Sequence, residues 1–191
     1  MQAEWEVEQK YIVDDVVSLR TNLAAQGFEW INSEANSDIY FRHPCRDLRA
    51  TDEAFRLRTV DDRCCVTYKG KRLPGPVKTR PEIELDVSRA DHDSWLVMLQ
   101  HLGFKPLPAV NKHRQNFALS QNIEAKLPKI HVTLDEVEFL GYFAELELIV
   151  TEESQLDLAA SRIEQLACRL GLVSVQPRSY LSLTLEKLGV E

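Results

Sequence analysis

Hydrophobic and charged residues alternate along much of this 191-residue chain. Near its start, Glu6, Glu8 and Lys10 occupy alternate positions, with Val7 between the first two and Tyr11 after the third. Successive side chains of an extended strand point to opposite faces, so this stretch predicts a strand with one charged and one apolar face. The same reasoning predicts seven further strands, at residues 39–41, 54–59, 64–69, 77–87, 110–119, 130–137 and 142–150.

Three segments have the apolar spacing of amphipathic helices, and each is followed by a glycine that can end a helix. We expect their apolar stripes to pack against the sheet. The predicted N-caps are, in chain order, Asp14 or Asp15, then Ser88 or Asp91, then Thr151 with Glu152 and Glu153 in the first turn. Residues 36–37 are predicted to be a loop, and residues 178–188 a short helix or a last strand.

The charged faces of the predicted strands segregate by sign. Acidic residues dominate the first strand and 142–150, and basic residues dominate 54–59 and 110–119. One interpretation is an open antiparallel sheet with helices on one side and water on the other. The second is a sheet that closes with its charged face inward, forming a tunnel lined by both signs. We favour the tunnel because few Ser, Thr or Gln residues dilute the charged positions.

Length and composition are those of a globular protein, and no linker divides the chain, so we expect one domain over residues 1–191. The net charge of −7 argues against a general nucleic-acid binder. No apolar run approaches the roughly 20 residues that a membrane helix needs, and the expected location is the cytoplasm. The sequence contains neither a GxxxxGK[ST] loop nor a GxGxxG motif.

A tunnel with clusters of both signs suits a polyphosphate. Arginine grips phosphate oxygens in pairs through its planar guanidinium, and lysine adds a compact positive charge. Clustered carboxylates are oxygen ligands for Mg²⁺ or Mn²⁺, which bridge to substrate phosphates. The pattern therefore predicts a divalent cation beside a triphosphate.

The motifs that carry this chemistry occur in a recognisable order along the chain. Glu6-x-Glu8-x-Lys10 resembles the ExExK signature of the CYTH superfamily, the triphosphate tunnel metalloenzymes. Further segments that resemble the family's motifs are the stretch 47–58 with Arg56 and Arg58, Thr67-Tyr68-Lys69-Gly70, Lys78 to Glu84, Lys112-x-Arg114, residues 134–141, and Glu145-x-Glu147. The resemblance covers essentially the whole chain.

The resemblance implies an α+β fold, a closed eight-stranded antiparallel β-barrel (tunnel) with amphipathic helices packed outside. It implies metal ligation by Glu6, Glu8, Glu145 and Glu147. It implies triphosphate binding by Lys10, Arg56, Arg58, Lys69, Arg80, Lys112 and Arg114. Catalytic roles would fall on Lys10, Arg58, Lys69 and Asp135, the last helping the metal or orienting a nucleophile. Glu82 and Glu84 would be partners of the basic groups.

Within the superfamily, the stretches 39–41, 47–54, 134–143 and 179–181 look most like the class IV adenylyl cyclases, although Phe139 stands where that pattern has a glycine. The resemblance therefore implies a metal-dependent enzyme, using Mg²⁺ or Mn²⁺, that converts ATP to cyclic AMP and pyrophosphate. Two alternatives remain open: hydrolysis of inorganic or thiamine triphosphate in the same tunnel, and a non-catalytic polyphosphate- or nucleotide-binding module. The partner is then ATP or another triphosphate, and family resemblance implies a homodimer.

Overall fold

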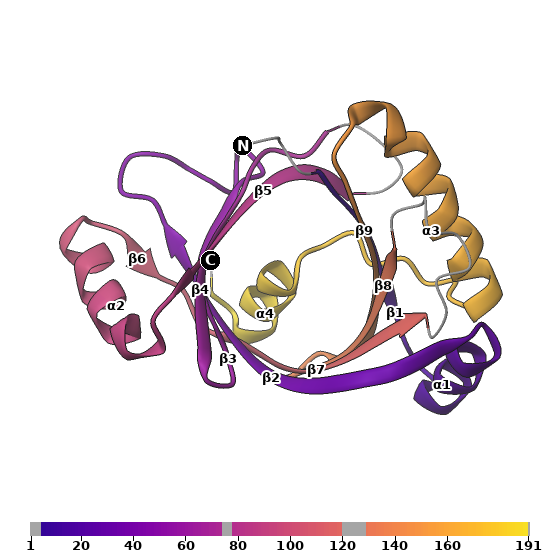
Figure 1. The fold of residues 1–191 in the computed structure, drawn as a ribbon. Coiled ribbons are helices and arrows are strands. Elements are labelled where there is room, and N and C mark those ends of the chain that lie inside the picture. The colour runs from indigo at the N-terminus through magenta and orange to yellow at the C-terminus, as the bar shows by residue number, and fades with distance from the viewer. Residues whose placement is uncertain (1–4, 74–77, 120–128, 191) are drawn as a thin grey trace.

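Eight antiparallel strands close into a ring in this computed structural model, which describes residues 5–73, 78–119 and 129–190 (Figure 1). The order around the ring is β1–β5–β4–β3–β2–β7–β8–β9, with β9 pairing back onto β1. The strands are β1 (Trp5–Ile12), β2 (Phe28–Arg42), β3 (Ala54–Val60), β4 (Arg63–Lys69), β5 (Lys78–Val87), β7 (Val110–Leu119), β8 (Ile130–Val137) and β9 (Gly141–Val150). A short strand, β6 (Lys105–Pro106), pairs with the end of β2. The predicted closed eight-stranded barrel is confirmed.

The alternation of each strand decides which side chains enter the ring. In β1, Glu6 and Lys10 line the internal cavity, whereas Val7 is buried in the apolar core on the other face. In β9, Glu145 lines the cavity and Leu146 lies in the same outer core. The charged faces therefore converge inside the barrel, and the open sheet with a water-exposed charged face is wrong for this chain.

Two helices cover part of the outside of the barrel: one lies over β1 and β9, and the other lies beside that helix and the start of β2. Asp15 is the N-cap of helix α1 (Val16–Ala25), and its carboxylate accepts a hydrogen bond from Ser18 N at 2.9 Å. Helix α3 (Leu156–Leu170) buries a stripe that includes Ile163 and Leu166. The largest apolar core lies between these helices and the outward faces of β1, β7, β8 and β9.

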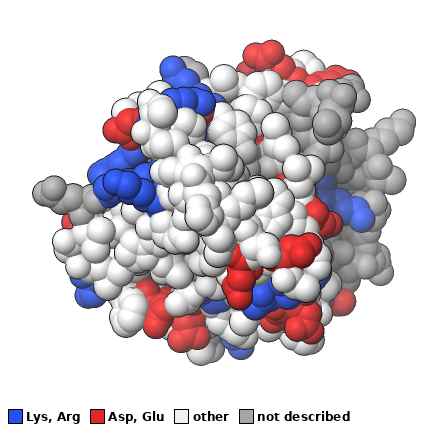
Figure 2. Space-filling model, turned by 90° about the vertical axis from the view of Figure 1, so that its left-hand side faces the viewer, with Lys and Arg blue, Asp and Glu red and all other residues white. Residues whose placement is uncertain are grey.

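The outer face of β2–β5 has a smaller cover. Helix α2 (His92–His101) follows a 3₁₀ turn (Arg89–Asp91) and packs Leu99 against Phe41 and Leu57. On β5, Ile83 and Leu85 remain exposed. Figure 2 shows this side of the molecule, where a broad area contains few charged side chains.

The C-terminal segment forms helix α4 (Tyr180–Leu188), which settles the two possibilities for the tail in favour of a helix. Ser179 caps it by accepting a hydrogen bond from Ser182 N at 3.1 Å. Viewed along the barrel, α4 lies across the ring (Figure 1), and Tyr180 and Leu185 line the internal cavity.

Three local predictions were wrong or need qualification. The predicted loop at residues 36–37 lies inside β2, which runs from Phe28 rather than from residue 39, because β3 and β7 pair with this polar segment from both sides. Thr151 does not cap α3: residue Glu152 is extended, a 3₁₀ turn (Glu153–Gln155) follows, and the helix begins five residues after Thr151, at Leu156. The start of the predicted strand 77–87, residue 77, lies outside the described residues.

Phe139, the departure from the family pattern, lies in the turn between β8 and β9. Its φ of 64° is in the left-handed region, where glycine or asparagine is at ease and an aromatic residue is strained. The ring is exposed, so the departure concerns the turn rather than the charged interior. None of the helices in the described ranges has the length and apolar character required to cross a membrane.

Candidate active site

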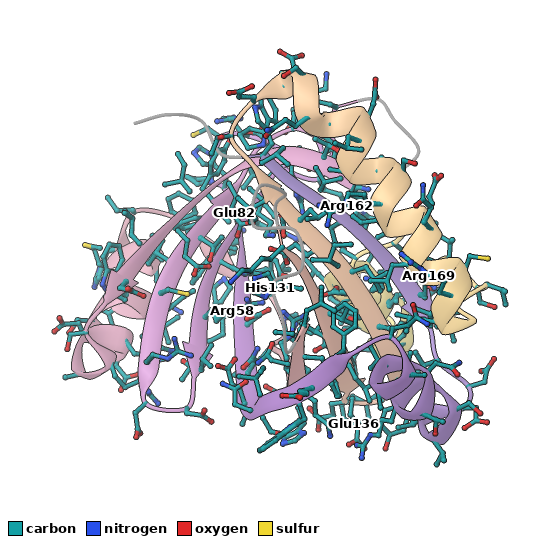
Figure 3. All side chains as sticks on the ribbon, turned by 45° about the vertical axis from the view of Figure 1, so that its right-hand side comes forward. Arg58, Glu82, His131, Glu136, Arg162 and Arg169 are labelled. Atoms are coloured by element: carbon teal, nitrogen blue, oxygen red, sulfur yellow. The ribbon has the colours of Figure 1, made fainter. Side chains whose placement is uncertain are left out.

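A cavity of about 1020 Å³ occupies the inside of the barrel. Side chains from seven of the described strands reach it. Eleven of the twelve residues predicted for the site line its wall: Glu6, Glu8, Lys10, Arg56, Arg58, Lys69, Arg80, Lys112, Arg114, Glu145 and Glu147. Figure 3 shows Arg58 and Glu82 pointing into the barrel, whereas Arg169 of α3 lies outside it. The twelfth predicted residue, Asp135, is completely buried, at 0% exposed.

On the β2–β5 side, Asp38 holds the two arginines of β3. Its carboxylate accepts hydrogen bonds from Arg58 Nε at 2.6 Å and Nη2 at 2.7 Å, and lies 3.5 Å from Arg56 Nη1. Burial alone would raise the pKa of Asp38, but the charges of Arg56 and Arg58 outweigh it and hold the pKa well below its usual range. Asp38 is therefore a buried anion that fixes both guanidiniums toward the cavity.

Lys69 lies between two glutamates on neighbouring strands. Its ammonium nitrogen is 2.6 Å from an oxygen of Glu6 and 2.6 Å from an oxygen of Glu82, and Glu82 also lies 3.8 Å from Arg56. The predicted role of Glu82 as a partner of basic groups is confirmed. Glu84 instead accepts a hydrogen bond from Thr67 Oγ1 at 3.0 Å.

On the opposite side, Asp135 anchors the basic residues of β7. It accepts hydrogen bonds from Lys112 Nζ at 3.1 Å, from Arg114 Nε at 2.7 Å and Nη2 at 2.6 Å, and from Tyr180 Oη at 3.0 Å. Arg114 also pairs with Glu145. Burial would raise the pKa of Asp135, but the charges of Arg114 and Lys112 lower it. Both oxygens of Asp135 are thus occupied by cationic or hydroxyl donors.

Lys10 differs from the lysines and arginines described so far. Its side chain is 2% exposed, and Nζ lies 3.8 Å from the ring centroid of Tyr180 and 5.9 Å from that of Phe143. Within the described part of the chain it forms no ion pair with a carboxylate. Burial lowers the pKa of Lys10 to about 8, and the nearby charge of Glu145 offsets only part of this effect.

The glutamates predicted to hold a metal lie on β1 and β9. Glu8 faces Glu147 across the strand pair, and three of the four are paired with cations: Glu6 with Lys69, Glu8 with Lys78 at 3.1 Å, and Glu145 with Arg114. No set of three or more His, Cys, Asp or Glu side chains in the described ranges is already gathered around one point as a metal site.

The electrostatics of this wall nevertheless fit a divalent cation. Burial, together with the neighbouring charges of Glu6 and Glu8, raises the pKa of Glu147 to about 8. Burial also raises the pKa of Glu6 despite the Lys69 ammonium. When Glu147 is deprotonated, the three carboxylates carry more negative charge than Lys69 and Lys78 compensate, and a hard divalent cation is the partner that carboxylate oxygens accept.

Arg80 lines the cavity from β5, opposite Glu6 in the strand register. Among the residues that the structure describes, it has no carboxylate partner. Its charge is therefore free to meet an anionic ligand.

A second cavity of about 700 Å³ lies toward the other ends of the strands. Arg58, Glu84 and Arg114 line both cavities. The interior therefore extends past these side chains, as the prediction of a tunnel requires.

Sequence reasoning missed three residues of this wall: Asp38, Lys78 and Tyr180. Lys78 begins a segment that resembles a family motif, but the resemblance gives this lysine no role. Asp38 lies just before the predicted strand 39–41, and its position opposite Arg58 of β3 is set by strand pairing rather than by a local pattern. Tyr180 belongs to the stretch 179–181 that resembles the family, but the resemblance gives it no role, and it reaches the cavity only through the packing of α4.

Comparison with known proteins agrees with this geometry. The model of the CYTH domain matches residues 4–180. A protein of Methanocaldococcus jannaschii named "Putative adenylate cyclase MJ0240" is 33% identical over 180 residues, 93% of this chain and 97% of its own length. Adenylate cyclase CyaB of Aeromonas hydrophila is 32% identical over 190 residues, 98% of this chain and 92% of its own.

Among solved structures, the PH1819 protein of Pyrococcus horikoshii OT3 superposes with a TM-score of 0.83 at 36% identity, covering 95% of this chain and 99% of its own. Three findings support the same assignment: the closed barrel, its charged interior and the family match over nearly the whole sequence. The chain belongs to the CYTH domain family.

Proposed function

We propose that this protein is a divalent-metal-dependent adenylyl cyclase that converts ATP to cyclic AMP and pyrophosphate. The coarser statement, an enzyme that acts on triphosphates, follows from membership of the CYTH family and from relatives that are named adenylate cyclases. The observation that carries the proposal is the cavity wall, on which lysines and arginines from β1, β3, β4, β5 and β7 surround one space beside a group of glutamates.

In this proposal the triphosphate lies along the cationic wall. Arg56 and Arg58 on one side and Arg114 on the other grip phosphoryl oxygens in pairs. Lysine ammoniums add point charges without a fixed donor geometry, and Arg80 adds a further guanidinium. The roles fall on Lys10, Arg56, Arg58, Lys69, Arg80, Lys112 and Arg114.

Glu6, Glu8 and Glu147 would hold Mg²⁺ or Mn²⁺, and Glu145 would contribute after exchanging its contact with Arg114. The cation would supply neutralisation of charge on the phosphoryl oxygens. The raised pKa values of Glu6 and Glu147 support this assignment, because a cation would relieve the carboxylate repulsion. To bind the cation, Glu6 would have to turn away from Lys69 and Glu8 from Lys78.

For the reaction itself, the 3′-hydroxyl oxygen bonds to the α-phosphorus and gives up its proton to solvent, while the bond from the α-phosphorus to the bridging oxygen breaks and pyrophosphate leaves with the electron pair. Lys10, Arg58 and Lys69 stabilise the charge that develops on the phosphates, and positioning supplies much of the acceleration. Asp135 acts in this proposal by orienting Lys112 and Arg114, because both its oxygens are held by their donors and by Tyr180.

Hydrolysis of a triphosphate is the second candidate, since the same grip on the phosphates serves water as the nucleophile. Purified protein is incubated with Mg²⁺ or Mn²⁺ and either ATP or tripolyphosphate, and the products are separated by chromatography. Cyclic AMP with pyrophosphate supports the cyclase, and phosphate release from tripolyphosphate supports the hydrolase. Tight binding without turnover of either substrate overturns both.

The site itself is tested by Glu8→Ala and Arg58→Ala, each of which we expect to lower turnover by at least about 10²-fold. Glu136→Ala and Arg169→Ala are the matched controls, because both residues are exposed on the outside of the barrel (Figure 3). Circular dichroism checks the fold, and Asp38 keeps Arg56 as a partner after the loss of Arg58. Full activity of both site variants would remove the assignment of the cavity.

A further inference from the structure

Tyr180 contacts both lysines that lie at the β1 and β7 side of the cavity. Lys10 Nζ lies 3.8 Å from its ring centroid, and Lys112 Nζ lies 5.2 Å from it. The hydroxyl donates to Asp135, and the ring packs against Phe143 with a centroid distance of 5.2 Å. The side chain is buried, and both its ring and its hydroxyl have partners.

The way Lys10 is held differs from the way most cations of this wall are held. Lys69, Arg58 and Arg114 each contact carboxylates, which neutralise their charge until a ligand displaces the contact. An aromatic face attracts an ammonium through its quadrupole but carries no net charge. Lys10 is therefore held in place without a carboxylate contact, and its ammonium group remains available to an anion.

We infer that Tyr180 is a positioning residue: its ring presents the Lys10 and Lys112 ammoniums to the phosphate groups of the substrate, and its hydroxyl fixes the ring through Asp135. The inference rests on the proposed function in so far as the two lysines bind the triphosphate. Since Tyr180 is the first residue of α4, the C-terminal helix becomes part of the phosphate site.

The geometry supports this role at three points. Lys10, Lys112 and Tyr180 all line the same cavity, so the ring and the two ammoniums face the space that the triphosphate would occupy. Asp135 already holds Lys112 and Arg114, so a single buried carboxylate sets the position of both the ring and the basic pair. The Ser179 cap fixes the start of α4 and with it the backbone of Tyr180.

The test compares Tyr180→Phe with Tyr180→Leu. The phenylalanine variant keeps the ring, and we expect it to bind Mg²⁺–tripolyphosphate within about threefold of the wild type. The leucine variant keeps apolar volume but loses the ring, and we expect about tenfold weaker binding by calorimetry. With ATP, the loss should appear in KM and kcat together, because a misplaced cation affects both binding and the charge that develops during reaction.

Two further measurements separate positioning from a structural role. Protons close above an aromatic face are shifted upfield, so the ε-methylene signals of Lys10 should be upfield in the wild type and in Tyr180→Phe, and normal in Tyr180→Leu; Lys10→Arg assigns them. Placing pentafluorophenylalanine at position 180 keeps the shape of phenylalanine but removes the negative ring face. Its expected binding is about tenfold weaker than that of Tyr180→Phe, and the same replacement of Phe28, which lies in the outer core, should leave binding unchanged.

If the leucine variant does not fold, the fluorinated variant decides the question alone. Equal binding of tripolyphosphate by the phenylalanine and pentafluorophenylalanine variants would overturn the inference, and so would lysine signals that do not depend on the ring. Binding and NMR need no turnover. A protein without cyclase activity could therefore still confirm the role of Tyr180, and an active cyclase could still refute it.

Discussion

The two halves of the barrel wall have the same plan inside and different covers outside. In the arc β2–β5, the buried Asp38 holds Arg56 and Arg58, and in the arc β7, β8, β9 and β1, the buried Asp135 holds Lys112 and Arg114. Outside, the second arc lies under α1 and α3, whereas the first is covered mainly by α2, with α1 reaching only the start of β2, and leaves part of β5 exposed (Figures 1 and 2).

This difference separates two demands on the same strands. The inward positions are constrained by charge, because each group of buried cations needs an anion in either arc. The outward positions are constrained by the burial of apolar side chains, and more of these side chains are buried under α1 and α3. The cost of an outward substitution should therefore depend on the arc, and that of an inward substitution should not.

The largest effect on stability is expected for Leu146→Ala. Leu146 points outward from β9 and is 0% exposed in the core beneath α3. Loss of its side chain removes buried apolar contacts and leaves a cavity, at a cost of about 2–5 kcal/mol in the free energy of unfolding. Denaturant unfolding measures the loss, and a change below about 1 kcal/mol would contradict the account of this core.

Occupation of the glutamate wall by a metal should have the next largest effect. If Glu6, Glu8 and Glu147 hold the cation, Mg²⁺ or Mn²⁺ at a hundredfold excess over its dissociation constant adds about 2.7 kcal/mol to the free energy of unfolding. The cation requires deprotonated carboxylates, so its effect should grow as the pH rises toward and above the pKa of Glu147 near 8.

Without metal, the free energy of unfolding should change with pH in the opposite direction. The pKa of Glu147 is about 8 in the folded protein and about 4.3 when unfolded, so the folded state binds more protons in this interval and stability falls as the pH rises. Thermal unfolding between pH 6 and pH 9, with and without Mg²⁺, measures both slopes. Glu147→Gln should flatten them and Glu136→Gln should not; a metal effect independent of pH would remove Glu147 from the site.

Asp38→Asn tests the inward plan of the β2–β5 arc. The variant leaves Arg56 and Arg58 beside a neutral amide, which costs about 1–3 kcal/mol at neutral pH. Because the folded pKa of Asp38 is depressed, its stabilising effect is complete above the unfolded value of about 3.9 and is lost as the pH falls toward the folded value. The difference between wild type and variant should therefore shrink below about pH 4, and a difference constant down to pH 2 would refute the ion pairs.

Much of the inner wall could be predicted from the sequence because strand alternation is a local property. Arg56 and Arg58 face the cavity for the same reason that Leu57 between them faces the core. Asp38 was missed because its strand runs through a polar segment without apolar alternation, and pairing with β3 and β7 specifies it.

The contribution of Tyr180 depends on longer-range packing. No periodicity predicts that a helix at the end of the chain lies across the barrel and meets Lys10 of the first strand. The start of α3 was misplaced for a related reason: a capping residue at position 151 is worth about 1 kcal/mol, and the path of the chain away from β9 outweighs it.

The smallest effect, and the sharpest contrast with Leu146, is expected for Leu85→Ala. Leu85 also points outward from a barrel strand, between the inward Glu84 and Asp86, but it is 60% exposed. Its truncation should change the free energy of unfolding by no more than about 0.5 kcal/mol. The family resemblance implies a homodimer, and a second copy seated on this face would bury Leu85 and make the loss larger and dependent on protein concentration. Unfolding at two concentrations tenfold apart therefore distinguishes an exposed strand face from one covered by another copy of the chain.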